Sequence, residues 1–253
     1  MTRMKRVVIT GISGCIGRVL YDNLSERWDI SGLDVRESPG IRVRIADIAD
    51  ENSVAGSFQD ACAVIHLAAN ASAGASWQEV KGPNIEGTKN VFEAARIAGV
   101  QKVIFASSNH VTGLYERDEP YCSIIAGRYD GLDPGTLRRI DHTMPVRPDG
   151  YYGISKAFGE ALGRYYAEVY GMQVICLRIG TVNRENRPLD IRQRATLFMH
   201  PDLVKMVDMC LLAEDIGFEI FYGVSANTWR FWDTAPVRDC LGWEPEENAA
   251  LTG

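Results

Sequence analysis

VVITGISGCIGRVL, residues 7–20, joins a short β-branched run to a helical pattern through three glycines. The run that ends at Thr10 is typical of a strand buried on both faces of a sheet. The spacing after it predicts a helix from about Cys15 to Arg27. A strand, a glycine turn and a helix in this order predict the first β–α unit of an α/β domain.

The same alternation continues along the chain. Further strands are predicted at residues 29–34, 41–47, 63–69, 102–108 and 172–180. Helices are predicted near residues 51–60, 84–99 and 152–171. Strands that alternate with helices imply right-handed crossovers, and therefore an α/β fold with a Rossmann-type, doubly wound parallel sheet flanked by helices. We expect a single domain over residues 1–253, with a nucleotide-binding core at 1–180 and a small substrate-binding part at 181–253.

Residues 114–150 interrupt this rhythm. The segment is rich in Pro, Gly, Asp and Arg and has weak periodicity, so it is predicted to be a long loop or lid inserted after the fifth strand. Beyond it, the sequence predicts a basic loop at 184–194, a helix near 201–213 and a strand at 218–225.

Composition narrows the range of partners. The formal net charge is −6, the isoelectric point is about 5.3 and there is no long Lys/Arg run. These features argue against nucleic acid or an anionic membrane as a partner. No stretch reaches the ~20 apolar residues of a membrane span, and Gly11 and Gly14 interrupt the only run that resembles an export signal. The six cysteines are scattered without a C-x-x-C pair, which predicts a cytoplasmic protein without disulfides or a bound metal.

The glycine turn is expected to bind phosphate. Gly11, Gly14 and Gly17 form a G-x-x-G-x-x-G spacing that lets a pyrophosphate approach the backbone amides at a helix N-terminus. Asp34 ends the second strand, 17 residues beyond Gly17, where an acid bonds the adenosine ribose hydroxyls and repels a 2′-phosphate. NAD is therefore favoured over NADP, although Arg36 argues for NADP. Asp47, at the end of the third strand, reaches the adenine edge or caps a helix.

Tyr152 and Lys156 lie four residues apart at the start of a predicted helix and therefore share one of its faces. A nearby ammonium favours the phenolate of a tyrosine, whose ordinary pKa is about 10, so the pair can act as a base. The alternative is an amphipathic surface pair without a role in catalysis. Tyr151 is an unsuitable base because its spacing from Lys156 places it on another face.

These features resemble the short-chain dehydrogenase/reductase superfamily, in its extended, epimerase/dehydratase-like branch. Besides the glycine turn, the shared motifs are HLAA at 66–69, N-x-x-G-T at 84–88, SS at 107–108 and Y-x-x-x-K at 152–156. The resemblance implies that Tyr152 is the catalytic base and that Lys156 lowers its pKa. It also implies that Ser108 holds the reacting hydroxyl and that Asn84 supports the lysine through water. The implied cofactor is NAD, bound by Gly11, Ser13, Gly14, Cys15, Ile16, Gly17, Asp34, Asp47, Ile48, Leu67, Ala68, Ala69, Tyr152 and Lys156.

The finer resemblance is to NAD-dependent uronate dehydrogenases, through FASSNHVTG, RPDGYYGISKAFGE, LRIG and GVSANTWRFWD. They oxidise C1 of a hexuronate to an aldarolactone. Archaeal NAD-dependent glucose-6-phosphate dehydrogenases share SSNH, and segment 114–150 looks more like theirs, but the modest acidity of this chain does not suit their high-salt setting. A small anionic sugar is thus the expected substrate, bound by Ser72, Ser108, Asn109, His110 and Arg192.

Three further expectations concern other reactions and assembly. Only 73 residues follow Gly180, which leaves little protein for a nucleotide-sugar subdomain and disfavours sugar-nucleotide epimerisation. A regulator that binds NAD without oxidising a substrate is the other alternative, and the intact Ser-Tyr-Lys set argues against it. By analogy with the superfamily, the helices at 84–99 and 152–170 are expected to form the seam of a homo-oligomer.

Overall fold

The computed structural model describes residues 4–249, and these form one parallel sheet of seven strands. The strand order is β3-β2-β1-β4-β5-β6-β7, and every neighbouring pair is parallel. The strands are β1 (Arg6–Thr10), β2 (Asp29–Asp34), β3 (Val43–Ile45), β4 (Ala63–His66), β5 (Lys102–Ser108), β6 (Gln173–Ile179) and β7 (Phe218–Gly223). The chain runs outward from β1 in one direction and then from β4 in the other. The predicted doubly wound α/β fold is confirmed.

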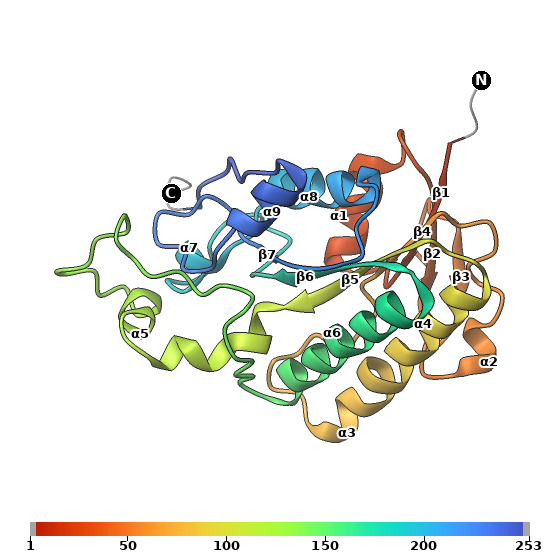
Figure 1. Cartoon of the computed structure of the whole chain (residues 1–253), viewed down its shortest axis with the longest axis horizontal. Helices are drawn as coiled ribbons and strands as arrows, with labels where there is room; N and C mark the ends of the chain where they lie inside the picture. The colour runs from red at the N-terminus through yellow and green to blue at the C-terminus, as the bar shows by residue number, and fades with distance from the viewer. Residues whose placement is uncertain (1–3, 250–253) are drawn as a thin grey trace.

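Helices cover both faces of the sheet (Figure 1). One face carries α1 (Cys15–Leu24), α8 (His200–Leu212) and α9 (Ala235–Leu241). The other carries α2 (Glu51–Val54), α3 (Trp77–Val80), α4 (Gly87–Ile97) and α6 (Tyr151–Tyr170). Within residues 4–249, no helix is both long and apolar enough to cross a membrane.

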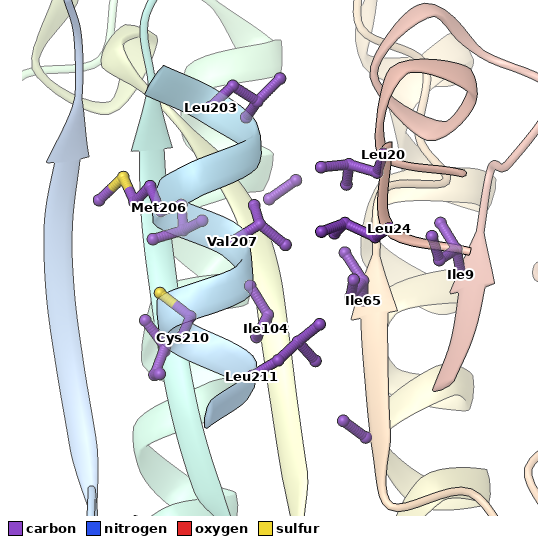
Figure 2. Packing of buried hydrophobic residues seen from close by; sticks show 14 of the residues in the cluster. Ile9, Leu20, Leu24, Ile65, Ile104, Leu203, Met206, Val207, Cys210 and Leu211 are labelled. Atoms are coloured by element: carbon purple, nitrogen blue, oxygen red, sulfur yellow. The ribbon is translucent and has the colours of Figure 1, made fainter. Parts of the chain in front are cut away.

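Two apolar clusters, one on each face, hold the layers together. On the first face, Leu20 and Leu24 of α1 lie beside Ile9 and Ile65 of the sheet, while apolar side chains of α8 approach Ile104 (Figure 2). The second cluster packs α4 and α6 against the opposite face of the same strands. Strands covered on both sides need apolar residues throughout, which is why the parallel strands could be recognised as continuous apolar runs.

The helix predicted at 84–99 begins earlier than expected. Helical structure starts at Trp77, continues through a π-helical turn η1 (Lys81–Glu86) and passes into α4. A capping box between Ser76 and Glu79 marks the start. Pro83 lies within this π-helical turn, and Asn84, the next residue, is buried.

Residues 114–150 are not a loop throughout, so that prediction needs correction. The 3₁₀ helix η2 (Asn109–Arg117) and α5 (Tyr121–Ile125) fill the first part. In the second part, the backbone N–H of Ile140 donates to the carbonyl oxygen of Phe231 at 2.7 Å. The segment packs into a third apolar cluster with Tyr222 and Trp232, so it forms one body with the C-terminal region. Trp232 is a core residue and stacks on Tyr222.

The C-terminal elements lie close to their predicted positions. Strand β7 and helix α8 match the expected strand and helix, and the basic loop contains the short helix α7 (Gln193–Thr196). The backbone N–H of Gly180 donates to the carbonyl oxygen of Gly223 at 2.8 Å, which continues the β6–β7 pairing toward the end of the sheet where the strands terminate.

Candidate active site

A cavity of about 750 Å³ lies at the carboxyl ends of the parallel strands. This is where ligands bind in open α/β sheets, because the strand order reverses between β1 and β4. Of the residues predicted to form the site, most line the cavity: Gly11, Gly14, Cys15, Ile16, Gly17, Asp34, Asp47, Ile48, Leu67, Ala68, Ala69, Ser108, Asn109, His110, Tyr152, Lys156 and Arg192. Ser13, Ser72 and Asn84 do not.

The glycine turn brings the N-terminus of α1 to the cavity. Gly11 has a φ of +74°, and a Cβ atom built there would lie 2.7 Å from the backbone nitrogen of Ala68. A larger residue is excluded on both grounds. The unpaired N–H groups of the first turn of α1 therefore face the cavity with the positive end of the helix dipole, which fits a pyrophosphate.

Asp34 is 7% exposed at the end of β2. Its two carboxylate oxygens accept the backbone N–H groups of Ser13 at 2.9 Å and of Arg36 at 3.1 Å. The role of Ser13 is therefore to hold Asp34 rather than to line the cavity. An ionised carboxylate has about four acceptor sites, so Asp34 retains capacity for the hydroxyls of a ribose.

Asp47 lies beside the same end of the cavity, after β3. Its Oδ1 accepts the backbone N–H of Ala49 at 2.9 Å, while the N-cap of α2 is Asp50. The carboxylate of Asp47 is thus free of the capping role that the sequence allowed. The apolar residues Ile48, Leu67, Ala68 and Ala69 also line the cavity.

Tyr152 and Lys156 occupy the first two turns of α6 and are both buried. The Lys156 ammonium nitrogen lies 5.6 Å from the centre of the Tyr152 ring and 5.0 Å from that of Phe105. Ser108 ends β5, and its hydroxyl lies close enough to Tyr152 to lower the pKa of the tyrosine. Both hydroxyl-bearing side chains line the cavity together with Lys156.

Burial disfavours the charged forms of both Tyr152 and Lys156. It raises the pKa of Tyr152 above its ordinary value, whereas the Ser108 hydroxyl lowers it. It lowers the pKa of Lys156 to about 7, because the ammonium has lost its water without gaining an ionised partner. In the free protein each group is therefore held toward its uncharged form at neutral pH, and added positive charge in the cavity would shift the tyrosine toward phenolate.

Asn84 is buried in η1, between the loop after β4 and helix α6. Its amide nitrogen donates to the carbonyl oxygen of Asn70 at 3.0 Å and to Ser155 Oγ at 2.9 Å. Its Oδ1 accepts the backbone N–H of Asn70 at 2.8 Å. Asn84 therefore ties the loop after β4 to the residue next to Lys156, which fixes the helix that carries Tyr152 and Lys156.

His110 is held beside Tyr152 by Asp149, an acid that was not among the predicted site residues. Its Nδ1 lies 2.7 Å from Asp149 Oδ2, and its ring meets the Tyr152 ring edge-on at 5.6 Å. Gly113 leaves the space for this acid, since a Cβ atom there would lie 2.2 Å from the same oxygen. Asp149 belongs to the sequence RPDG at 147–150 and stands three residues before Tyr152, so its position close to the tyrosine was visible in the sequence.

Arg192 lines the cavity opposite the glycine turn, but its guanidinium is already paired. Its Nε and Nη2 donate to the two carboxylate oxygens of Glu116 at 2.7 and 2.6 Å. Its Nη1 donates to Thr181 Oγ1 at 3.3 Å. The fork expected to bind a substrate acid is therefore closed by an internal acid, and Glu116 was hidden in a segment whose fold the sequence did not reveal.

Two other polar groups, His66 and Ser107, have framework roles. His66 bonds the hydroxyls of Thr10 and Thr88 at 2.7 and 3.2 Å, and burial lowers its pKa to about 3, so the ring is neutral. Ser107 donates to Glu160, whose carboxylate accepts two more bonds from a buried arginine, Arg178. Ser72 is exposed, so the geometry does not support a contact with the sugar.

The arrangement suits proton removal from an alcohol. The hydroxyls of Ser108 and Tyr152 and the amine of Lys156 all line the same cavity as the glycine turn, so an alcohol bound there would lie within reach of a base. Among residues 4–249, no group of three or more His, Cys, Asp or Glu side chains is arranged to bind a metal ion.

Comparisons with known proteins agree with this geometry. Residues 7–196 match the model of the NAD dependent epimerase/dehydratase family. Two relatives from Haloferax volcanii are an L-arabinose 1-dehydrogenase (NAD(P)(+)) and an NAD-dependent glucose-6-phosphate dehydrogenase. They are 33% and 34% identical, over 98% and 96% of this chain and 98% and 94% of theirs. A uronate dehydrogenase from Pseudomonas putida is 33% identical over 98% of this chain and 86% of its own.

A solved structure resembles the whole chain. It is a point mutant of the uronate dehydrogenase from Agrobacterium tumefaciens, complexed with NAD, and it superposes with a TM-score of 0.81 at 31% identity. The match covers 98% of this chain and 87% of that one.

Proposed function

Because the chain belongs to the NAD-dependent epimerase/dehydratase family, we propose that it oxidises the C1 hydroxyl of a hexuronate to an aldarolactone. The observation that carries this proposal is the cavity itself. Ser108, Tyr152 and Lys156 lie on one side of it and Arg192 lies on another, which suits a small sugar with an acid group. Relatives named as uronate dehydrogenases support it.

In the proposed reaction, the C1 hydroxyl binds between Ser108 and Tyr152. Tyr152, as phenolate, removes the hydroxyl proton, and Ser108 keeps the alcohol oxygen in reach. NAD⁺, when bound, supplies the hydride acceptor. Lys156 lies behind the tyrosine and stabilises the phenolate in its charged form. Asn109 and His110 contact the sugar hydroxyls, and Asp149 fixes the orientation of the His110 ring.

Arg192 is proposed to receive the acid group at the other end of the sugar. A guanidinium binds carboxylates through two parallel hydrogen bonds, and Glu116 occupies that geometry in the free protein. Binding of a hexuronate by this fork therefore requires the sugar to displace Glu116 or to share Arg192 with it. The preference for an acidic sugar then depends on how strongly Arg192 binds the carboxylate of the sugar compared with that of Glu116.

An uncharged aldose is the second candidate, and the Glu116–Arg192 pair is the observation that favours it. A neutralised arginine offers little attraction to an anion but still donates hydrogen bonds to hydroxyls. The L-arabinose 1-dehydrogenase among the relatives supports this alternative. Glucose 6-phosphate remains a third substrate, supported by the SSNH motif and by the Haloferax volcanii relative.

One assay separates these substrates. Formation of NADH is followed at 340 nm with NAD⁺ and, in turn, glucuronate, galacturonate, L-arabinose, glucose 6-phosphate and UDP-glucose. The proposal expects the highest kcat/KM with a hexuronate. A higher value with L-arabinose or glucose 6-phosphate would replace the substrate assignment, whereas no NADH with any sugar would favour a regulator or an epimerase.

Arg192→Met is the companion variant. It is expected to raise the KM for the hexuronate at least tenfold while changing the KM for L-arabinose much less. Arg187→Met, in the same basic loop but outside the cavity lining, is the matched control. Equal effects of Arg192→Met on both sugars would remove Arg192 from acid recognition.

A further inference from the structure

A second, smaller cavity lies at the β3 edge of the sheet. It has a volume of about 240 Å³ and is lined by β1, β2, the β3 region and residues 56–57, which follow α2. Its lining shares only Leu33 with that of the candidate active site. Figure 1 shows β3 and α2 together at this side of the molecule.

The alternation of side chains gathers three arginines on one face of this edge. Arg6 and Val8 are two residues apart in β1, and Val8 pairs in register with Ser31 of β2. Arg42 and Arg44 are two residues apart at β3. Residues two apart on a strand share a face. All three arginines and Ser31 line the cavity.

The charges around the cavity do not cancel. Arg42 donates to Asp29 Oδ1 at 2.8 Å, while Arg44 and Arg6 donate to backbone carbonyl oxygens between residues 53 and 59. These contacts set three guanidinium groups against one carboxylate. Each guanidinium has five N–H donors and uses one of its nitrogens in these contacts, so donors remain for a ligand.

Two serine hydroxyls give an independent indication of a ligand. Ser31 is 5% exposed and Ser57 is 6% exposed, and both line the cavity, one from β2 and one from the segment after α2. Within residues 4–249, neither hydroxyl has a hydrogen-bond partner. Buried hydroxyls are nearly always paired in folded proteins, so two orphaned ones in a single cavity indicate an occupant that accepts hydrogen bonds.

We propose that this cavity binds a phosphate group, either as free phosphate or as the terminal group of a small metabolite. Its free polar groups are arginine N–H groups, which only donate, and hydroxyls, which can donate. A tetrahedral oxyanion offers acceptors in several directions and a charge of the required sign. The ligand would join β1, β2 and β3 to the chain after α2.

The test is calorimetric titration of the protein with inorganic phosphate and, separately, with glycerol 3-phosphate. Saturating NAD⁺ is present so that the glycine turn is filled. We expect one phosphate per chain, and binding at least tenfold weaker in Ser31→Ala/Ser57→Ala and in Arg44→Met. Arg164→Met removes an exposed charge on α6 and should bind like the wild type. The tighter of the two ligands identifies the source.

The double serine variant also has a readout without ligand. Because neither hydroxyl has a partner, its midpoint of thermal unfolding should equal or exceed that of the wild type. A lower midpoint would show that the hydroxyls already have structural partners. Equal phosphate binding by the double variant and the wild type, or none by the wild type, would overturn the site.

Discussion

Lys156→Met should stabilise the cofactor-free protein while abolishing its activity. Burial lowers the pKa of Lys156 from 10.5 to about 7. The pKa of this lysine is therefore about three and a half units lower in the folded chain than in the unfolded chain. Each unit corresponds to about 1.36 kcal/mol. The charged lysine therefore destabilises the fold by up to about 5 kcal/mol below pH 7. Methionine keeps most of the aliphatic stem and carries no charge, so it removes this penalty without leaving a large cavity.

The pH dependence has a definite sign. Between pH 7 and 10.5 the unfolded chain binds a proton at Lys156 that the folded chain does not, so wild-type stability rises with pH across this window. The advantage of Lys156→Met is greatest below pH 7, falls to about 2 kcal/mol at pH 9 and vanishes above pH 10.5. Titrations of groups that Lys156 does not affect cancel in the difference, and His66, whose pKa burial and Lys156 both lower, is neutral in the folded wild type across this pH range.

Urea unfolding of both proteins at pH 6.5, 7.5 and 9 measures this difference by linear extrapolation. Lys81→Met changes an exposed lysine and should alter the free energy of unfolding by at most about 0.5 kcal/mol. A Lys156→Met protein that is less stable than the wild type at pH 6.5 would refute the reasoning. So would a stability difference that stays constant from pH 6.5 to 9, because it would show that the buried amine is not the cause.

Four other predictions follow from the site. Tyr152→Phe should lower kcat at least ~100-fold and leave the Kd for NAD⁺, measured by fluorescence titration, within a factor of two or so; retained turnover would remove Tyr152 as the base. Asp34→Ser should raise the ratio of kcat/KM for NADP⁺ to that for NAD⁺ by about tenfold or more, because it removes a carboxylate that repels the 2′-phosphate; an unchanged ratio would contradict that role. Gly113→Ala should destabilise the fold by about 1–3 kcal/mol in urea unfolding, since its Cβ atom would overlap the Asp149 carboxylate; wild-type stability would show that the acid can move. Glu116→Gln should raise the preference for a hexuronate over L-arabinose by about tenfold, because it removes a competing negative charge; a lower preference would mean that Glu116 positions the arginine for the acid.

The sequence was most informative where local pattern and tertiary structure agree. The parallel strands are apolar throughout because both of their faces are covered, so their positions could be recognised without a partner. Likewise, the glycine turn lies between β1 and α1, and Asp34 ends the next strand, so their separation in the sequence depends only on local structure. Most of the predicted cavity lining therefore came from the ends of predicted strands.

The sequence was least informative where a residue acts through a distant partner. Glu116 is 76 residues from Arg192, and nothing near either one predicts that they pair. The prediction of a loop at 114–150 failed for a related reason, since Ile140 is buried in an apolar cluster that includes Phe231 and Trp232 of the C-terminal region. Periodicity within the segment is weak because tertiary packing, rather than one helical face, holds it in place.

The site therefore depends on acids that do not themselves react. Asp149 orients His110, Glu160 anchors the end of β5 through Ser107, and Glu116 closes the fork of Arg192. The first two pairings leave the wall around Tyr152 rigid before a substrate arrives, which lowers the cost of orienting it. The pairing of Glu116 with Arg192 differs, because an acid group of the substrate must compete with Glu116 for the guanidinium. Under the proposed function, chemistry at C1 and recognition of the far end of the sugar are separable, and a single neutral replacement of Glu116 should change substrate choice while leaving Ser108, Tyr152 and Lys156 in place.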